Sequence, residues 1–211
     1  MQARDVDYRC GEVNLRGYLA LDGSTAGKRP GVLVFHEGLG LGDFAMERAR
    51  RLAGLGYVAL AADMFGDRRQ ASNLQEVANL VGGLRAEPEE LRARGRAALE
   101  TLAALPEVDA GRLAAIGFCF GGSVVLELAR EGADLKAVVS FHGVLTTKMP
   151  AQPGQMKASV LVCTGVDDPL APPQQVADFE NEMRTGAVKD WQVTPMATRC
   201  TASPTRPPTV R

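Results

Sequence analysis

One cysteine in this sequence has the surroundings of a catalytic nucleophile. Cys119 is the centre of a Gly-x-Cys-x-Gly pattern that follows the apolar run Leu113–Phe118 and precedes residues at helical spacing. A sharp turn from a strand into a helix needs glycine on both sides, because side chains at Gly117 and Gly121 would collide with neighbouring backbone. At a helix N-terminus, unpaired amides and the helix dipole favour thiolate. The pattern predicts a nucleophile elbow; the alternative is a buried cysteine in an ordinary strand-to-helix crossing.

Other polar residues follow apolar runs elsewhere in the chain. His36 and Glu37 come directly after Val32–Phe35, His142 follows a second run, and Asp168 follows a third. A carboxylate at such a strand end could orient a histidine base, and glycines after Glu37 could supply an oxyanion amide. Each residue also has a plain structural explanation. Asp168 precedes a proline as turn aspartates do, Glu37 could be a solvated loop carboxylate, and both histidines are expected to be structural imidazoles near the site.

Alternating apolar runs and helical patterns predict the elements that position these residues. Buried runs that alternate with helices imply a mostly parallel sheet with helices on both faces, and ligands bind such sheets at the C-terminal ends of the strands. An antiparallel pair between Tyr8 and Leu21 should precede them. The sequence predicts one domain over residues 1–193 and an irregular tail over 194–211. The expected strands are 32–35, 57–62, 113–118, 137–141 and 159–163, and the expected helices lie within 45–53, 91–105 and 176–183.

Composition narrows the class of protein. The 211 residues are 45% hydrophobic and carry a net charge of −1, so no basic surface for nucleic acid or an anionic membrane is expected. The mixed Arg and Glu residues between 85 and 100 are interpreted as a solvated helix face. No signal peptide or membrane span is evident, and four cysteines without C-x-x-C spacing argue against a zinc site. We expect a cytoplasmic protein, monomeric or homodimeric.

Five segments, in this order, resemble the dienelactone hydrolase (carboxymethylenebutenolidase) family of α/β-hydrolases. The resemblance runs from about Tyr8 to about Val193, and its most specific part is the cysteine elbow together with His-Glu after the first long strand. The segments are His-Glu-Gly-Leu-Gly, Ala-Asp-Met-Phe-Gly, Gly-Phe-Cys-Phe-Gly-Gly, Val-Ser-Phe-His-Gly and Thr-Gly-x-x-Asp-Pro.

The resemblance implies an α/β-hydrolase fold and a set of roles. Cys119 would be the nucleophile of a Cys-Asp-His triad, Asp168 its acid, and Glu37 a switch carboxylate that helps to generate thiolate. The amides of Gly38 and Phe120 would form the oxyanion hole. Such enzymes cleave small esters or lactones through an acyl-enzyme and use neither metal nor organic cofactor.

The sequence departs from the family where the triad histidine should stand. No histidine follows His142, and the chain after Val193 lacks helical or strand periodicity. Read in a shifted frame from the third base of the Pro195 codon, the tail can encode Tyr-Gly-Asp-Ala-Val-His-Ser-Phe, the missing family segment. We therefore hypothesise a frameshift near Thr194 or Pro195.

Without that histidine, the chain as written is expected to be acylated but not to turn over, because Asp168 would have no imidazole to orient. Turnover would instead mean that His36, His142 or Glu37 supplies the base. The resemblance also implies a final helix after the missing family segment, and the irregular tail lacks the pattern to form it. Its absence should leave one face of the sheet partly uncovered. Two other functions stay open: a noncatalytic ligand-binding or structural α/β protein that retains the elbow, and a thiol redox sensor that uses Cys119 and Cys163.

Overall fold

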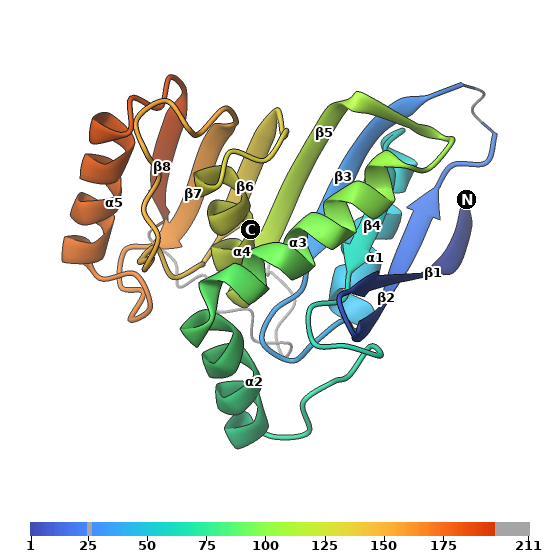
Figure 1. Ribbon diagram of the computed structural model, residues 1–211, viewed down its shortest axis with the longest axis horizontal. Helices are drawn as coiled ribbons and strands as arrows, with labels where there is room; N and C mark the ends of the chain where they lie inside the picture. The colour runs from blue at the N-terminus through green and yellow to red at the C-terminus, as the bar shows by residue number, and fades with distance from the viewer. Residues whose placement is uncertain (25–26, 197–211) are drawn as a thin grey trace, which may run out of the picture.

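The computed structural model describes residues 1–24 and 27–196. Its strands form one sheet in the order β1-β2-β4-β3-β5-β6-β7-β8 (Figure 1). The strands are β1 (Gln2–Cys10), β2 (Val13–Leu21), β3 (Arg29–Phe35), β4 (Val58–Ala62), β5 (Val108–Phe118), β6 (Ala137–Phe141), β7 (Ser159–Gly165) and β8 (Trp191–Met196).

The sheet is mostly parallel, as predicted. β1 and β2 form an antiparallel hairpin at one edge, and β2 pairs antiparallel with β4. All pairs from β4 through β3 to β8 are parallel. Parallel strands need crossovers, which the helices provide, and their carboxyl ends therefore meet at one edge of the sheet. The arrangement agrees with the sheet expected from the alternating pattern and with the α/β-hydrolase fold that the family resemblance implies.

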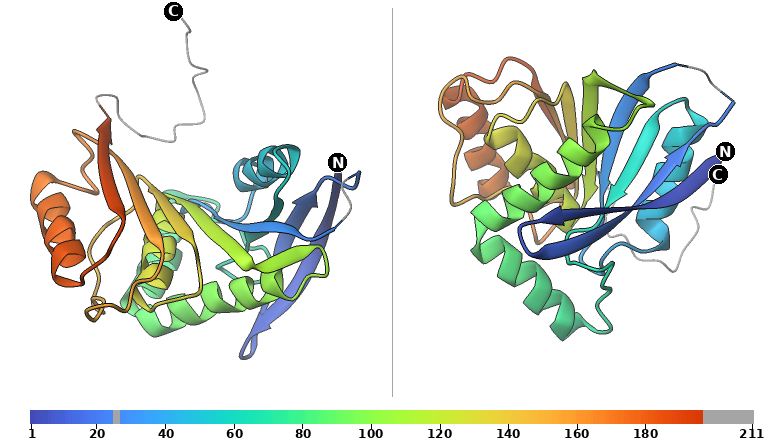
Figure 2. Two further views of the ribbon diagram at one scale, coloured as in Figure 1. Left: turned by 90° about the horizontal axis from the view of Figure 1, so that it is seen from above. Right: turned by 45° about the vertical axis from the view of Figure 1, so that its right-hand side comes forward.

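Helices cover both faces of the sheet (Figure 2). α1 packs against β2, β3 and β4 on one face, while α3 and α4 pack against each other and against β3 and β5 on the opposite face. α5 lies beside β8 at the far edge. The helices are α1 (Asp43–Gly54), α2 (Leu74–Ala86), α3 (Pro88–Ala103), α4 (Phe120–Arg130) and α5 (Pro173–Thr185).

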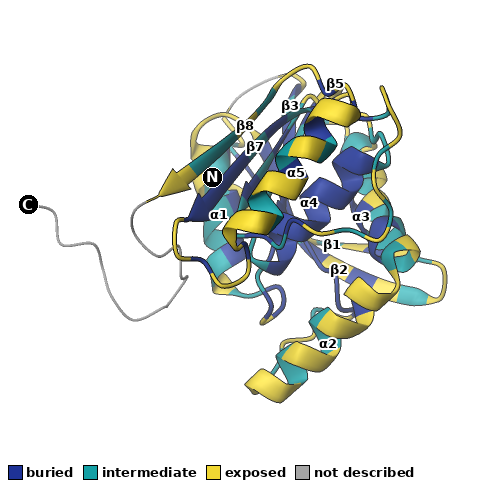
Figure 3. Cartoon of the chain, turned by 90° about the vertical axis from the view of Figure 1, so that its left-hand side faces the viewer, coloured by how far each residue is buried: buried dark blue, intermediate teal, exposed yellow. Residues whose placement is uncertain are grey.

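The elements predicted from the sequence do not include α2. Its start carries a capping signal, since the Asn73 side chain accepts the amide of Glu76 at 2.9 Å. Gly82 and Gly83 lower its helix propensity, and Leu84 is the only buried residue of this helix. Val77, Leu80, Val81 and Leu84 nevertheless recur at helical spacing, a signal that the predicted elements left out. Exposed residues accordingly cover much of α2 in Figure 3.

The expectation that the mixed Arg and Glu residues between 85 and 100 form a solvated helix face is wrong for Arg92. Arg92 is buried, with 7% of its surface exposed. Its guanidinium donates to Glu127 of α4 at 2.9 and 2.7 Å, and Glu127 also accepts from Arg130. Arg130 in turn pairs with Glu182 of α5. Buried charges must be paired, so this network joins three helices on one face of the sheet.

The face of the sheet that α1 covers is partly bare in the described part of the chain. α1 lies over β2, β3 and β4, where the residues of its cluster are buried. Farther along the same face, Ile116, Val139 and Leu161 are only half-buried. These apolar strand residues therefore stay partly accessible to solvent.

β8 extends past the expected end of the folded domain. The irregular tail was expected from Thr194, but β8 continues to Met196 and pairs with β7 up to Gly165. Pro195 is accommodated because β8 is an edge strand of the described sheet, where a missing amide donor is tolerated. The rest of the expected tail, the frameshift hypothesis and the missing final helix concern residues 197–211, which lie outside the described residues. Within the described residues, no helix is both long and apolar enough to cross a membrane.

Candidate active site

Cys119 occupies a strained turn between β5 and α4. Its backbone has φ 52° and ψ −111°, a conformation that L residues rarely adopt. A Cβ at Gly117 would lie 1.9 Å from the Gly121 carbonyl oxygen, and one at Gly121 would lie 2.3 Å from the Phe35 oxygen. Only glycine fits at either position. The turn therefore has the geometry predicted for a nucleophile elbow, and its strain presents the thiol at the carboxyl edge of the sheet.

Small residues let the end of β6 lie directly against this elbow. A Cβ at Gly122 would approach Ser140 Oγ to 2.7 Å and the Cα of Gly143 to 2.9 Å. The Cys119 amide donates to the carbonyl of Phe141 at 2.8 Å. The residue between Phe141 and Gly143 is consequently held next to the nucleophile.

That residue is His142, and it links the nucleophile to Asp168. Its Nδ1 donates a hydrogen bond to Asp168 Oδ2, and its ring is also a hydrogen-bond partner of the Cys119 side chain. The hydrogen bond with Cys119 has the largest effect on the pKa of His142 and raises it; burial, the second-largest effect, lowers it. The hydrogen bond and charge of Asp168 add to the rise, and the pKa lies at about 9. Its backbone is left-handed, with φ 56°.

The structure corrects the expectation that Asp168 has no imidazole to orient. That expectation followed the order nucleophile, acid, histidine along the chain, which excluded His142 because it precedes Asp168. The sheet order, however, places β6 between β5 and β7. A histidine at the end of β6 therefore lies between a nucleophile after β5 and an acid after β7, whatever its position in the sequence.

Asp168 is buried and does more than form a turn. Only 5% of its surface is exposed. Its Oδ1 accepts the amide of Leu170 at 2.9 Å, the contact expected of an aspartate in a turn. Its Oδ2 is left for His142. The turn thus fixes the carboxylate while its second oxygen orients the ring, as a histidine base requires.

Glu37 contributes a half-buried carboxylate at the end of β3. Burial raises the pKa of its carboxyl group, while its own backbone amide and the charge of Arg48 oppose the shift. Among the described residues, its Oε2 has no hydrogen-bond partner. Glu37 is thus a carboxylate with an unused acceptor, and in the described part of the chain its side chain forms no hydrogen bond with Cys119.

Gly38 and Phe120 provide the two amides expected to form an oxyanion hole. Phe120 is the first residue of α4, whose amide has no acceptor within its own helix. Among the turn, loop and cap hydrogen bonds of the described residues, none is donated by the amide of Gly38 or of Phe120. A Cβ at Gly38 would lie 2.9 Å from Cγ1 of Val77 in α2, so a larger residue there requires the Val77 side chain to shift. α2, which is absent from the predicted elements, therefore packs on the candidate oxyanion loop.

His36 has the structural position that we expected. It is fully buried, and its Nδ1 donates to the Glu37 carbonyl at 2.6 Å while Nε2 accepts the amide of Met64 at 3.3 Å. Its ring lies 4.8 Å from that of Phe65 and 5.9 Å from that of Phe120. Burial lowers its pKa, which keeps the ring neutral. His36 braces the loop that carries Glu37.

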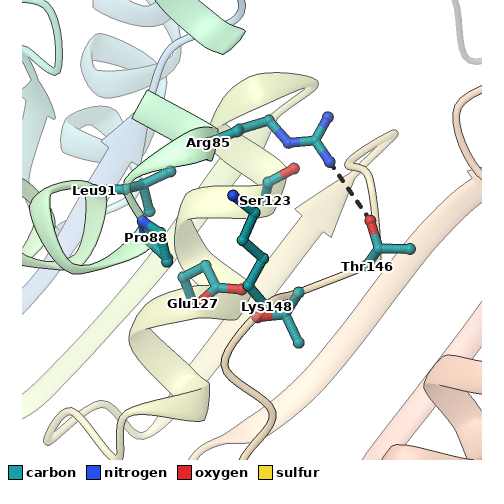
Figure 4. Close-up of a pocket in the computed structure, with 8 residues that line it drawn as sticks. Arg85, Pro88, Leu91, Ser123, Glu127, Thr146 and Lys148 are labelled. Carbon is teal, nitrogen blue, oxygen red and sulfur yellow. Dashed lines mark hydrogen bonds between the residues drawn. The ribbon is translucent and has the colours of Figure 1, made fainter. Parts of the chain in front are cut away.

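A separate pocket of about 260 Å³ lies among α2, α3, α4 and the segment after β6 (Figure 4). Arg85 and Lys148 bring positive charge to it, and Arg85 lies 3.5 Å from Thr146 Oγ1. Glu127 of the buried network also lines it. Cys119 is not among its lining residues, so this pocket is distinct from the elbow.

Comparison with known proteins identifies the family. The model of the dienelactone hydrolase family matches residues 15–194. The chain belongs to this family. A solved structure titled m3DLH is 48% identical, with a TM-score of 0.88, and the match covers 93% of this chain and 81% of that one. A second, titled as the dienelactone hydrolase-like promiscuous phosphotriesterase P91 from metagenomic libraries, is 46% identical with a TM-score of 0.86 and covers 92% and 81%.

Curated relatives carry names that agree with the family. An Escherichia coli (strain K12) protein provisionally named carboxymethylenebutenolidase is 27% identical over 187 residues, or 83% of this chain and 68% of the relative. A Bradyrhizobium protein provisionally named 2-oxo-3-(5-oxofuran-2-ylidene)propanoate lactonase is 30% identical over 169 residues, or 75% and 67%. The chain is therefore a hydrolase of the dienelactone hydrolase type by family.

The raised pKa of His142 predicts how stability depends on pH. A ring that binds its proton more tightly in the folded chain, at about 9, than at its ordinary value of 6.5 stabilises the fold fully below about pH 6.5. The contribution is lost as pH rises from there through about 9. Urea unfolding at pH 6 to 9.5 should show the wild type losing stability relative to His142→Asn, and parallel profiles for the two chains would contradict the coupling.

Proposed function

We propose that this chain hydrolyses small carboxylic esters or lactones through a thioester on Cys119. The observation that carries the proposal is the left-handed backbone of Cys119, packed by glycines at the carboxyl edge of the sheet. Storing strain at one residue is typical of functional sites, and the first turn of α4 brings an unpaired amide next to the sulfur. The names of the Escherichia coli and Bradyrhizobium relatives support an ester or lactone as substrate.

The reaction assigns a role to each neighbour of the thiol. The Cys119 sulfur attacks the acyl carbon, and the amides of Gly38 and Phe120 stabilise the oxyanion that forms. Asp168 orients an imidazole, and Glu37, with its buried unpartnered oxygen, assists removal of the thiol proton when substrate enters. This chemistry requires neither metal nor organic cofactor. The expectation of acylation without turnover rested on an unpartnered Asp168, and the His142 contact removes its basis.

A phosphotriester is a second electrophile that suits the same groups. The structural relative at 46% identity is titled a promiscuous phosphotriesterase. A thiol and two oxyanion amides serve attack at phosphorus as well as at carbon, since both reactions develop charge on an oxygen that the amides can bind. Paraoxon is therefore a useful second substrate in the assay below.

Labelling of Cys119 tests the proposed function. The full chain is mixed with p-nitrophenyl acetate, quenched in acid within the first turnovers and digested, and peptide mass spectrometry locates the acetyl group. We expect acetyl on Cys119 in near-stoichiometric amount, and none on Cys10 or Cys163. A noncatalytic scaffold would release no nitrophenolate burst, and acetylation spread over lysines alone would contradict the proposal.

The geometry disfavours a redox sensor that pairs Cys119 with Cys163. Phe118, which precedes Cys119, pairs with Phe141 of β6, and Phe141 pairs with Cys163 of β7. Two strand spacings separate the elbow from Cys163, roughly 9–10 Å. A disulfide requires Cα atoms within about 7 Å, so this pair cannot close without moving β6.

A further inference from the structure

The end of β6 places one backbone segment between nucleophile and acid. The Cys119 amide donates to the Phe141 carbonyl at 2.8 Å, and the His142 amide donates to the Cys163 carbonyl at 2.8 Å. Both hydrogen bonds continue the parallel ladder past the ends of the strands. His142 is therefore held beside the elbow by β5 on one side and by β7 on the other.

The side chain of His142 completes a line of hydrogen bonds. Nδ1 donates to Asp168 Oδ2, whose side chain is 1% exposed. With Nδ1 engaged, Nε2 is the nitrogen that remains for the Cys119 side chain, the other hydrogen-bond partner of the ring. The imidazole itself is 15% exposed, so solvent and a substrate can reach it. Carboxylate, imidazole and thiol thus stand in the order that nucleophilic catalysis requires.

We propose that His142, at the end of β6, is the general base and general acid of this hydrolase and does the work of the histidine that the sequence lacks after β8. The inference rests on the proposed function of Cys119. Before attack the thiol proton passes to His142 Nε2, which holds it while the sulfur bonds to the acyl carbon. When the tetrahedral intermediate collapses, the carbon–oxygen bond to the leaving group breaks, and the same proton passes from Nε2 to the departing alkoxide. Thioester and alcohol result.

Deacylation uses the ring a second time. Neutral His142 removes a proton from water, whose oxygen attacks the thioester carbon; the carbon–sulfur bond then breaks, the sulfur is reprotonated from Nε2, and the carboxylic acid leaves. The hydrogen bond with Cys119 is the largest cause of the raised pKa of His142. Acylation of the sulfur removes that contribution, so the ring, which has given its proton to the alkoxide, stays neutral at the stage when a base is needed.

The left-handed backbone of His142 determines which substitutions test this role. At φ 56°, asparagine and glycine are the residues that adopt the native conformation most readily. His142→Asn keeps a polar side chain without a base, and His142→Gly leaves a space of imidazole size beside Asp168. Both variants should therefore fold, which far-UV circular dichroism and urea unfolding will check.

The test separates acylation from turnover with p-nitrophenyl acetate at pH 7.5. We expect steady turnover by the wild type and a loss of about 10²–10⁴-fold in kcat for His142→Asn, His142→Gly and Asp168→Asn. Free imidazole should restore turnover to His142→Gly but not to Asp168→Asn or Cys119→Ala. Restoration by a soluble base is a response that a merely structural histidine would not give. In NMR titrations, the His142 ring should titrate near pH 9 in the wild type and lower in Cys119→Ala.

The outcomes distinguish this inference from the proposed function. If Cys119 is acetylated and His142→Asn turns over as fast as the wild type, the proposed role of His142 is wrong, whereas the proposed cysteine hydrolase is supported. If wild-type Cys119 is acetylated but never released, His142 is not the deacylation base and the inference again falls alone. If Cys119 is not acetylated at all, both fall.

Discussion

Replacing Cys119 by alanine is expected to abolish acetyl transfer and to lower kcat/KM for p-nitrophenyl acetate by about 10⁴–10⁶-fold. Members of a catalytic triad act as a unit, and loss of the nucleophile costs about as much as loss of all of them. Residual hydrolysis would come from binding and from the oxyanion amides alone. Initial rates over a substrate series, with the nitrophenolate burst recorded in the same traces, measure both quantities.

Two matched variants control this experiment. Cys10 ends β1 at the hairpin, is partly exposed and has no part in the proposed chemistry, so Cys10→Ser should keep kcat/KM within about twofold. Cys119→Ser keeps an oxygen nucleophile in the same elbow and should retain slow acetylation through the imidazole. An alanine variant that keeps more than about a tenth of the wild-type rate would place the nucleophile at another residue.

The elbow could be predicted from sequence because its tight packing allows only glycine at two positions. Only glycine fits at positions 117 and 121, where backbone oxygens lie 1.9 and 2.3 Å from an added Cβ. These two glycines flank Cys119 in the sequence and therefore identify it as the nucleophile of the predicted elbow. The ends of the strands could also be predicted, since the apolar runs stop where polar residues begin. Glu37, Asp168 and Cys119 consequently lie at one edge of the sheet, as expected for parallel strands.

The contacts of His142 with Cys119 and Asp168 could not be predicted from residue types in this way. Its partners depend on which strands are neighbours, and strand order is a property of the whole sheet and not of local pattern. Reasoning from the chain order of known triads excluded it, whereas the order β5-β6-β7 brings it between Cys119 and Asp168. The one local signal was its neighbourhood of small residues, Ser140 and Gly143, which allow the turn to approach α4.

α2 is absent from the predicted elements although the sequence carries signals for it. Val77, Leu80, Val81 and Leu84 recur at helical spacing after the capping residue Asn73, but Gly82 and Gly83 interrupt the pattern and the helix buries only Leu84. Arg92 shows the converse error. A charge within a mixed Arg and Glu run is usually solvated, but here Glu127 on another helix supplies the partner that permits burial. The burial of Arg92 thus depends on a long-range partner, which local sequence does not reveal.

Replacing Gly117 by alanine is expected to prevent stable folding, at a cost above about 4 kcal/mol in the free energy of unfolding. The added Cβ would lie 1.9 Å from the carbonyl oxygen and 2.2 Å from the carbonyl carbon of Gly121. Both are backbone atoms of α4, so no side-chain rotation relieves the clash. Relief requires moving the first turn of α4, and with it the amides that face the nucleophile, or shifting β5 within the centre of the sheet.

Gly83→Ala is the matched control, because it adds the same methyl group without a neighbour. Nothing lies within 4 Å of a Cβ at Gly83, which is exposed on α2, so alanine should stabilise the chain by about 0.5–1 kcal/mol through helix propensity. Urea unfolding followed by circular dichroism compares both variants with the wild type. A soluble Gly117→Ala chain within about 1 kcal/mol of the wild type would show that the elbow can relax, and the steric basis for assigning the nucleophile to Cys119 would fail.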